Sequence, residues 1–202
     1  MISVLVLNYN GRHHLESCLS SVLNTDYPDL EVMMIDNGST DDSIQFVERN
    51  FPTVKIVGNS QNLGFARGYN SGVGNTYGEI LFFLNNDVEI DKNCIPRLFK
   101  RIQREDVACV SPKMKFFHDK DRINAAGGAC DIYGIGWNRG NGELDRGQYE
   151  REEEVFYAIG GAMMMKKEVW EMVGPFDERF FAYAEDLDWC WRARMLGYRI
   201  LY

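Results

Sequence analysis

Short apolar runs alternate, through the first half of the chain, with segments in which apolar residues recur every three or four positions. The short runs are typical of buried strands, and the wider spacing is typical of helices that bury one face. The predicted strands are 2–7, 31–35, 54–57, 80–84 and 107–110. The predicted helices between them are 15–23, 44–51, 64–75 and 94–104. This alternation predicts βαβ units, a parallel sheet and right-handed crossovers.

The second half of the chain is patterned more weakly. Residues 125–147 are rich in Gly and lack periodicity, which predicts a long loop or a loose hairpin. An apolar segment over 155–165 is interrupted by Gly160-Gly161. The remaining predicted elements are a helix over 168–173, a helix that ends at Leu196 and a strand that begins near 198. We find no repeat and no linker, so the sequence predicts one mixed α/β domain over 1–202.

Composition excludes some classes of function. The net charge of −8 leaves no basic surplus to neutralise phosphates, which argues against nucleic acid as a partner. The five Cys are odd in number and widely spaced, as is typical of reduced thiols in a cytoplasmic protein. No apolar run approaches the roughly 20 residues that a membrane-spanning helix needs. We therefore expect a soluble cytoplasmic chain without a transmembrane segment.

Polar side chains follow the predicted strand 80–84 at once, in the order Asn85-Asn86-Asp87. Ligands of open α/β sheets gather at the carboxyl ends of the strands. Oxygen-bearing side chains at such an end suit Mg²⁺ or Mn²⁺, which is then shared with substrate phosphates. The alternative is structural: these residues form an Asx-type turn and cap the helix that follows Asp91.

Three further residues at strand ends or helix starts are candidates for binding a nucleotide. The ring of Tyr9 could stack on a base, or it could be an ordinary packing residue. Asp36 could accept a hydrogen bond from the imide N–H of uracil or thymine, although it could also cap a helix. Arg67 lies in the first turn of a predicted helix, where a cation is electrostatically misplaced. It therefore either reaches toward an anion or is simply solvated.

A fourth polar cluster, Glu185-Asp186-Leu187-Asp188, precedes the last predicted helix. Acidic residues commonly stabilise a helix N-terminus, and this is the structural interpretation. The cluster also has aromatic neighbours, namely Phe180, Phe181, Tyr183, Trp189 and Trp191. Partial desolvation by these rings would raise the pKa of a carboxylate toward that of a useful general base.

Five motifs bring these candidates together. They are Val4-Leu5-Val6-Leu7-Asn8-Tyr9-Asn10, Asp36-Asn37-Gly38-Ser39-Thr40-Asp41, Asn62-Leu63-Gly64-Phe65-Ala66, Leu84-Asn85-Asn86-Asp87 and Glu185-Asp186-Leu187-Asp188. In this order they resemble the motifs of family 2 glycosyltransferases over nearly the whole chain. The likeness is closest to the rhamnosyltransferase-like branch, which acts in bacterial polysaccharide synthesis.

The resemblance implies a GT-A fold, Rossmann-like with a central, mostly parallel sheet. Residues 1–111 would form the nucleotide-sugar-binding half, and residues 112–202 the acceptor and catalytic half. The implied activity is that of an inverting hexosyltransferase with a UDP- or dTDP-sugar donor and Mg²⁺ or Mn²⁺ as cofactor. The implied acceptor is a saccharide or a lipid-linked saccharide, which leaves peripheral association with a membrane open.

The resemblance also assigns roles to residues. The implied nucleotide-sugar ligands are Tyr9, Asn10, Asp36, Arg67, Asn85 and Asn86. Asp87 would ligate the metal, because it lies at the position of the family's DxD motif. Asp186 would be the general base, with Glu185 beside it in the catalytic site.

Some family features differ in this chain. The DxD position keeps a single carboxylate, so weak metal binding is expected without donor. Family members usually extend further and often complete the metal site with a His, which implies that this chain is truncated. A nucleotidyltransferase is one alternative, although Asn8-Tyr9-Asn10-Gly11 is not the basic, Gly-rich loop that it would need. The other alternative is a nucleotide-sugar-binding module without turnover.

Overall fold

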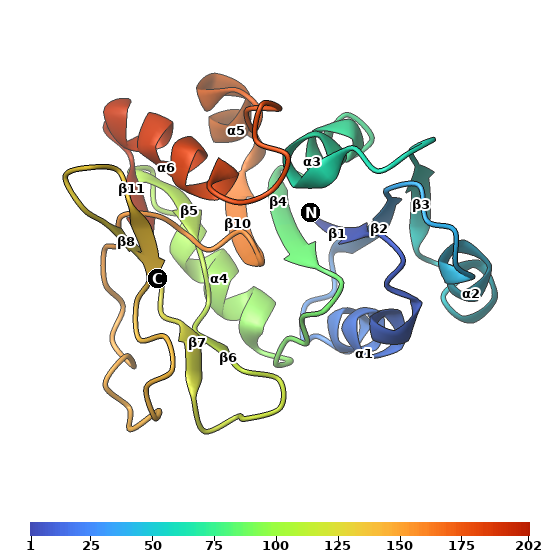
Figure 1. The fold of residues 1–202 in the computed structure, drawn as a ribbon, viewed down its shortest axis with the longest axis horizontal. Coiled ribbons are helices and arrows are strands. Elements are labelled where there is room, and N and C mark those ends of the chain that lie inside the picture. Colours follow the sequence, from blue (N-terminus) through green and yellow to red (C-terminus); the bar gives the residue numbers. More distant parts are fainter.

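The computed structural model describes residues 1–202 and is built around one seven-stranded sheet (Figure 1). Its strands are β1 (Ile2–Asn8), β2 (Leu30–Asp36), β3 (Lys55–Gly58), β4 (Ile80–Asn85), β5 (Val107–Val110), β10 (Ala162–Lys166) and β11 (Arg199–Leu201). They lie in the order β11-β5-β10-β4-β1-β2-β3. Strands β1 to β4 pair in parallel, as predicted from the alternation of elements.

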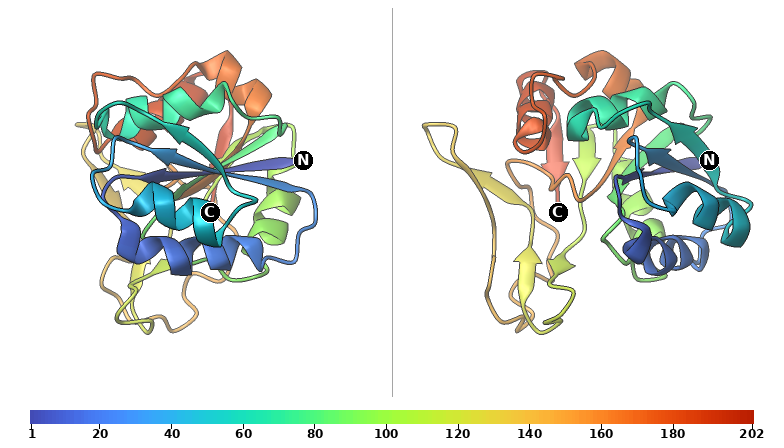
Figure 2. Two further views of the ribbon diagram at one scale, coloured as in Figure 1. Left: turned by 90° about the vertical axis from the view of Figure 1, so that its right-hand side faces the viewer. Right: turned by 45° about the vertical axis from the view of Figure 1, so that its right-hand side comes forward.

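Helices cover both faces of the sheet (Figure 2, left). They are α1 (Arg12–Leu23), α2 (Ser43–Asn50), α3 (Gly64–Val73), α4 (Cys94–Ile102), α5 (Lys167–Val173) and α6 (Glu185–Met195). Alternate residues of each strand enter opposite cores: Phe83 packs in the core that includes α3, α5 and α6, and Phe82 in the core that includes α1 and α4. Strands buried on both faces are apolar throughout, which explains the short continuous runs in the sequence.

The segment predicted as one apolar stretch over 155–165 contributes only strand β10. This strand lies between β4 and β5 and pairs with both in the antiparallel sense. Gly160 and Gly161 precede it, and the N–H of Asn85 donates a 3.0 Å hydrogen bond to the carbonyl of Gly161. A parallel neighbour needs a helical crossover, whereas this strand enters the sheet from an irregular segment. The sheet is therefore mixed and mostly parallel.

Two small hairpins lie beside the main sheet (Figure 2, right). One pairs β6 (Met114–Lys115) with β7 (Ile123–Ala125), and the other pairs β8 (Gly128–Cys130) with β9 (Gly136–Asn138). The second hairpin lies within the Gly-rich segment 125–147, for which a loop or loose hairpin was the prediction. None of the six helices has the length and apolar character that crossing a lipid bilayer requires.

Candidate active site

The polar ends of β1, β2 and β4 meet at one edge of the sheet, and Asn8 connects them. In the parallel register, Asn8 lies opposite Asp36 and Leu7 lies opposite Asn85. The fully buried amide of Asn8 donates a 3.0 Å hydrogen bond to Oδ1 of Asp36. Its Oδ1 accepts a 2.7 Å bond from the side chain of Asn86. Asn8 thus fixes two predicted site residues at the strand ends.

Asp36 and Asn10 hold the turn after β2. Asp36 is 1% exposed, and its Oδ2 accepts a 2.9 Å bond from the N–H of Ser39. Asn10 has a left-handed φ of 50°. Its Oδ1 accepts a 2.8 Å bond from the N–H of Thr40, so this side chain connects two turns of the protein. Tyr9, which precedes Asn10, is 48% exposed, and this leaves its ring available for stacking.

Asn37 is a structural residue of this edge that the sequence analysis did not single out. Its amide nitrogen donates to Oδ1 of Asn62 (3.0 Å) and to the carbonyl of Gly64 (2.9 Å). Its oxygen accepts bonds from Asn59 (3.2 Å) and from the N–H of Leu63 (3.1 Å). All four hydrogen-bonding positions of the amide are therefore filled, and β2 is joined to the start of α3.

A cleft of about 1470 Å³ lies next to this edge and brings together four of the predicted residues. Asn85 and Asp87 line it from the end of β4. Glu185 and Asp186 line it from the first turn of α6. Tyr9, Asn10, Asp36, Arg67 and Asn86 are not among its lining residues. The predicted catalytic and metal residues thus share one cavity, with the predicted base-binding residues beside it.

Asp87 has the properties of a ligand for a divalent cation. It is exposed, lines the cleft, and makes no ion pair or hydrogen bond through its side chain. Neighbouring Asn85 is less free, because its Oδ1 accepts a 3.3 Å bond from the hydroxyl of Tyr69. No group of three or more His, Cys, Asp or Glu side chains is arranged to hold a metal ion. A lone carboxylate fits Mg²⁺ or Mn²⁺ whose other ligands are phosphate oxygens and water.

Asp186 is fixed in the cleft by two backbone groups. Its Oδ2 accepts a 2.7 Å bond from the N–H of Gly160, and its Oδ1 accepts a 2.8 Å bond from the N–H of Leu187. Burial raises the pKa of this carboxyl, and the bond from Gly160 opposes that effect. Glycine suits this close approach, because a Cβ at position 160 would lie 3.2 Å from Oδ2 of Asp186, which is tighter than an ordinary van der Waals contact.

Glu185 is the more unusual of the two acids. Its side chain is 3% exposed, and its Oε2 is buried without a hydrogen-bond partner. Burial, together with the charge of Asp186, raises its pKa to about 7. A buried polar oxygen without a partner is costly, so this atom is a candidate for contact with a bound molecule.

The aromatic neighbours contribute less to this environment than the sequence analysis expected. Phe181 and Tyr183 are 62% and 88% exposed, so their rings face solvent. Tyr183 and the next residue, Ala184, both have left-handed backbone conformations, with φ of 73° and 69°. Trp189 is fully buried, and its Nε1 donates to the carbonyl of Gly174.

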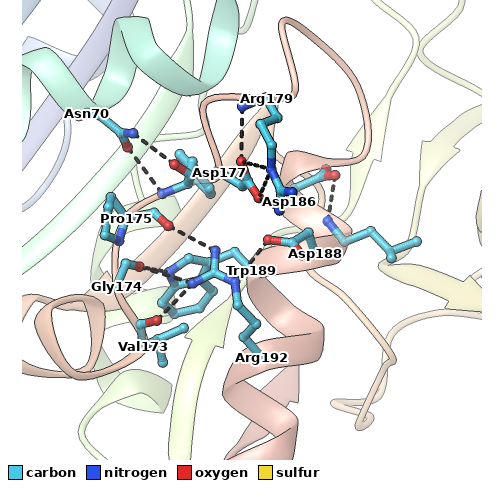
Figure 3. Close-up of polar contacts among 12 residues, drawn as sticks. Asn70, Val173, Gly174, Pro175, Asp177, Arg179, Asp186, Asp188, Trp189 and Arg192 are labelled. Carbon is cyan, nitrogen blue, oxygen red and sulfur yellow. Dashed lines mark hydrogen bonds and ion pairs between the residues drawn. The ribbon is translucent and has the colours of Figure 1, made fainter.

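Asp188 is not among the residues that line the cleft, and its carboxylate contacts Arg192 on the same helix (Figure 3). Its carboxylate accepts a 2.9 Å bond from Nε of Arg192, one helical turn later. The same guanidinium donates to the carbonyls of Val173 (2.8 Å) and Pro175 (2.9 Å), which lie at the end of α5. The interpretation that Asp188 serves the helix start is consistent with this ion pair.

Arg67 lies in the first turn of α3, and its Nε is 3.6 Å from Oε2 of Glu178. The anion that it faces is thus a residue of the loop before α6. That loop also contacts α3 through its backbone, since the N–H of Phe65 donates a 2.6 Å bond to the carbonyl of Phe181.

The fold of this chain matches that of solved structures with known ligands. The mannosyltransferase PcManGT from Pyrobaculum calidifontis, in complex with GDP-Man and Mn²⁺, is 22% identical with a TM-score of 0.73; the match covers 98% of this chain and 53% of that one. TarS 1-349 of S. aureus, in complex with UDP-GlcNAc, is 21% identical with a TM-score of 0.72; the match covers 99% of this chain and 55% of that one. These likenesses establish the GT-A fold.

Curated proteins of similar sequence include the low-salt glycan biosynthesis hexosyltransferase Agl10 of Haloferax volcanii, 23% identical over 96% of this chain and 61% of its own length. Another is the N-acetylglucosaminyl-diphospho-decaprenol L-rhamnosyltransferase of Mycobacterium tuberculosis, 26% identical over 93% of this chain and 68% of its own length. The chain spans only 23% of a third relative, an uncharacterized protein of Sinorhizobium fredii. The sequence model described as "Glycosyl transferase family 2" matches residues 3–174. The chain therefore belongs to glycosyltransferase family 2.

Proposed function

We propose that this chain is a metal-dependent, inverting glycosyltransferase. It transfers a sugar from a UDP- or dTDP-sugar to a hydroxyl group of a saccharide or a lipid-linked saccharide, in the synthesis of a polysaccharide or a cell-surface glycan. The observation that carries the proposal is the shared cleft, which Asp87 lines just after the end of β4 and Asp186 lines from the first turn of α6. A group that holds the leaving diphosphate and a base that activates the acceptor must face each other across such a cavity.

Asp186 is the proposed general base. Its carboxylate takes the proton of the acceptor hydroxyl as the acceptor oxygen forms a bond to the anomeric carbon. The bond between that carbon and the diphosphate oxygen breaks at the same time, and the electron pair leaves with the nucleoside diphosphate. Attack on the face opposite the leaving group inverts the anomeric configuration. The bonds from Gly160 and Leu187 hold the carboxylate in place for this step.

Asp87 would hold Mg²⁺ or Mn²⁺. When bound, the cation neutralises charge that develops on the leaving diphosphate. Support for a metal comes from the free carboxylate of Asp87 and from a neighbour of the same fold that was solved with Mn²⁺.

The donor nucleotide is proposed to lie at the adjoining strand ends. Tyr9 would stack on the base, and Asp36 would accept the imide N–H with a lone pair that its two internal bonds leave free. Arg67 would exchange Glu178 for a donor phosphate. This exchange costs little, because Arg67 and Glu178 are 59% and 51% exposed and exposed ion pairs contribute about 0–1 kcal/mol.

The test is transfer with a panel of UDP-, dTDP- and GDP-sugars in the presence of Mn²⁺. A glycosyltransferase releases a nucleoside diphosphate, and NMR of the product gives the anomeric configuration. Release of pyrophosphate would instead identify a nucleotidyltransferase. Donor binding without turnover, in this chain and in a longer one, would identify a binding module.

A further inference from the structure

The turn and the second strand of the β8–β9 hairpin carry large apolar side chains into solvent. Ile132, Tyr133, Ile135 and Trp137 are 91%, 83%, 64% and 50% exposed. The hairpin projects beyond the helices of the domain (Figure 2, right). No residue from 132 to 138 is charged. Exposed apolar side chains are common singly, but a group of four on one protruding hairpin indicates an interaction site.

The backbone of this turn is built to expose these side chains. Asp131 precedes the turn, and its Oδ1 accepts 2.9 Å bonds from the N–H groups of Tyr133 and Ile135. The single acid at the base of the turn is therefore engaged by the turn itself. Gly134 has a left-handed φ of 82° and completes the reversal of the chain.

The apolar surface continues onto α6. Leu187, Trp191 and Met195 recur every four residues and lie on one face of this helix. Met195 is 78% exposed, and Trp191 is 39% exposed. The hairpin packs close to this face, since a Cβ at Gly134 would lie 3.8 Å from the ring of Trp191. We call the four hairpin side chains and this α6 face the apolar ridge.

We propose that the apolar ridge inserts into the surface of a lipid bilayer and presents the cleft to an acceptor anchored there. The inference rests on the proposed function, in which a lipid-linked saccharide is the acceptor. Ile supplies apolar area, and the amphipathic rings of Tyr and Trp favour the level of the headgroups. Gly134 and Gly136 of the hairpin line the cleft together with Glu185 and Asp186. A saccharide held at the membrane would therefore meet the carboxylates directly.

Shape and charge favour a bilayer over a second copy of the chain. A protruding turn needs an apolar hollow on a protein partner, whereas the large cleft of this molecule is lined by many charged residues. The net charge of −8 and the uncharged turn exclude attraction to anionic lipids as the main force. Binding driven by apolar burial is expected to need no anionic lipid and to change little with salt.

The experiment is sedimentation with phosphatidylcholine vesicles, with and without phosphatidylglycerol, at low and high salt. We expect binding to both, and a reduction of about tenfold or more in Ile132→Ser/Tyr133→Ser. The matched control is Leu23→Ser/Tyr77→Ser, which removes exposed side chains (42% and 77%) of the same kinds outside the ridge. This control is expected to bind like the parent.

Fluorescence adds an independent measurement. Trp170 and Trp189 are buried, so lipids with brominated chains should quench mainly Trp137 and Trp191. Trp137→Phe should lose part of that quenching. The proposal would be overturned if the parent protein did not bind to vesicles, or if the hairpin variant bound to them as well as the parent does. A parent dimer that the hairpin substitutions dissociate in ultracentrifugation would also overturn it, because a second copy would then cover the ridge.

Vesicle binding needs neither donor nor acceptor, so its outcome is separate from that of the proposed function. The hairpin variant should also transfer sugar to a water-soluble acceptor at the parent rate, while its rate with a lipid-linked acceptor in vesicles falls. If no nucleotide sugar supports transfer but the protein binds to vesicles through the hairpin, the proposed function is wrong and the proposed membrane contact of the apolar ridge is retained.

Discussion

The carboxylate of Asp186 accepts a 2.7 Å hydrogen bond from the backbone N–H of Gly160. This bond joins the first turn of α6 to the segment that leads into β10, the antiparallel strand beside β4. The carboxylate that we propose as base is therefore held by the segment that leads into the central sheet as well as by its own helix. Its position relative to Asp87, at the end of β4, is fixed by the same strand pairing.

Asp186→Asn is expected to lower the transfer rate by a factor of about 10²–10⁴, because the base is lost. UDP affinity should change little, since the proposed donor ligands lie elsewhere. The amide can accept only one of the two backbone bonds well, so a cost of about 1–3 kcal/mol in stability is also expected. Urea unfolding separates this cost from the loss of rate. The matched variant Asp188→Asn should still transfer sugar. If Asp188→Asn lost transfer while Asp186→Asn remained active, the assignment of Asp186 as the general base would be wrong.

The raised pKa of Glu185 predicts a dependence of stability on pH. Its folded pKa of about 7 lies above the ordinary value of 4.5. Between these values the unfolded chain has released a proton that the folded chain retains, so this group lowers stability as pH rises from about 4.5 to about 7. Glu185→Gln has no carboxyl group at this position and lacks the effect. Between pH 4.5 and 7, its free energy of unfolding should therefore rise relative to that of the parent by about 2–3 kcal/mol.

Urea unfolding of the parent and of Glu185→Gln at pH 4.5, 6 and 7.5 would measure this difference. The sign is specific, because an acid with a lowered folded pKa would give the opposite trend. A constant difference between the two proteins at all three pH values would show that Glu185 titrates normally.

Asp87→Asn is expected to abolish metal binding that depends on nucleotide. With a single free carboxylate at this motif, Mn²⁺ should bind the parent weakly alone and more tightly once UDP supplies phosphate oxygens. Calorimetry measures the affinity for Mn²⁺ in the presence and in the absence of UDP. Tight binding of Mn²⁺ to the parent without nucleotide would contradict the prediction.

The positions of β1, β2 and β4 followed from the sequence because these central strands are largely apolar on both faces. The ends of Ile80–Asn85 and Ile2–Asn8 were clear for the same reason, since polar residues follow apolar runs there. The position of β10 in the sheet could not be predicted from the sequence, because an apolar segment does not indicate which strands it pairs with or in which direction it runs. Only the sheet shows that Met164 pairs with both Phe82 and Val110.

Among the candidate residues, the sequence located the carboxylates but not the amides that hold them. Asp87 and Asp186 stood out because they lie in two of the motifs that resemble family 2 glycosyltransferases, although acids at strand ends and helix starts also have structural uses. Asn8 is the last residue of β1 and Asn37 follows β2, and the sequence analysis gave neither of them a role, whereas Asn10 was an implied nucleotide-sugar ligand. Their importance comes from register, which sets Asn8 opposite Asp36, and from the contact of Asn37 with the start of α3. Such contacts between distant segments leave no local pattern.

Asp36 is expected to set the preference for the base. UDP or dTDP should bind better than GDP or ADP, and Asp36→Ala should remove that preference at a cost of roughly 1.5–3 kcal/mol in UDP binding. Because Asp36 also accepts bonds from Asn8 and Ser39, the variant must first be shown to be folded by circular dichroism. Equal binding of UDP and ADP by the parent would refute the idea.

Arg192 is expected to act as a positioning residue for the carboxylates of α6. Its guanidinium contacts Asp188 on its own helix and the carbonyls of Val173 and Pro175 beyond it, and a lysine cannot reproduce this planar fork. Arg192→Lys should therefore cost about 2 kcal/mol in stability and lower kcat, with the KM for the donor nearly unchanged. Arg194→Lys is the matched control, because both arginines lie on α6 and are 31% exposed, while Arg194 donates to one carbonyl, that of Val155. Equal effects of the two substitutions on kcat would show that Arg192 has no special role in holding the first turn of α6.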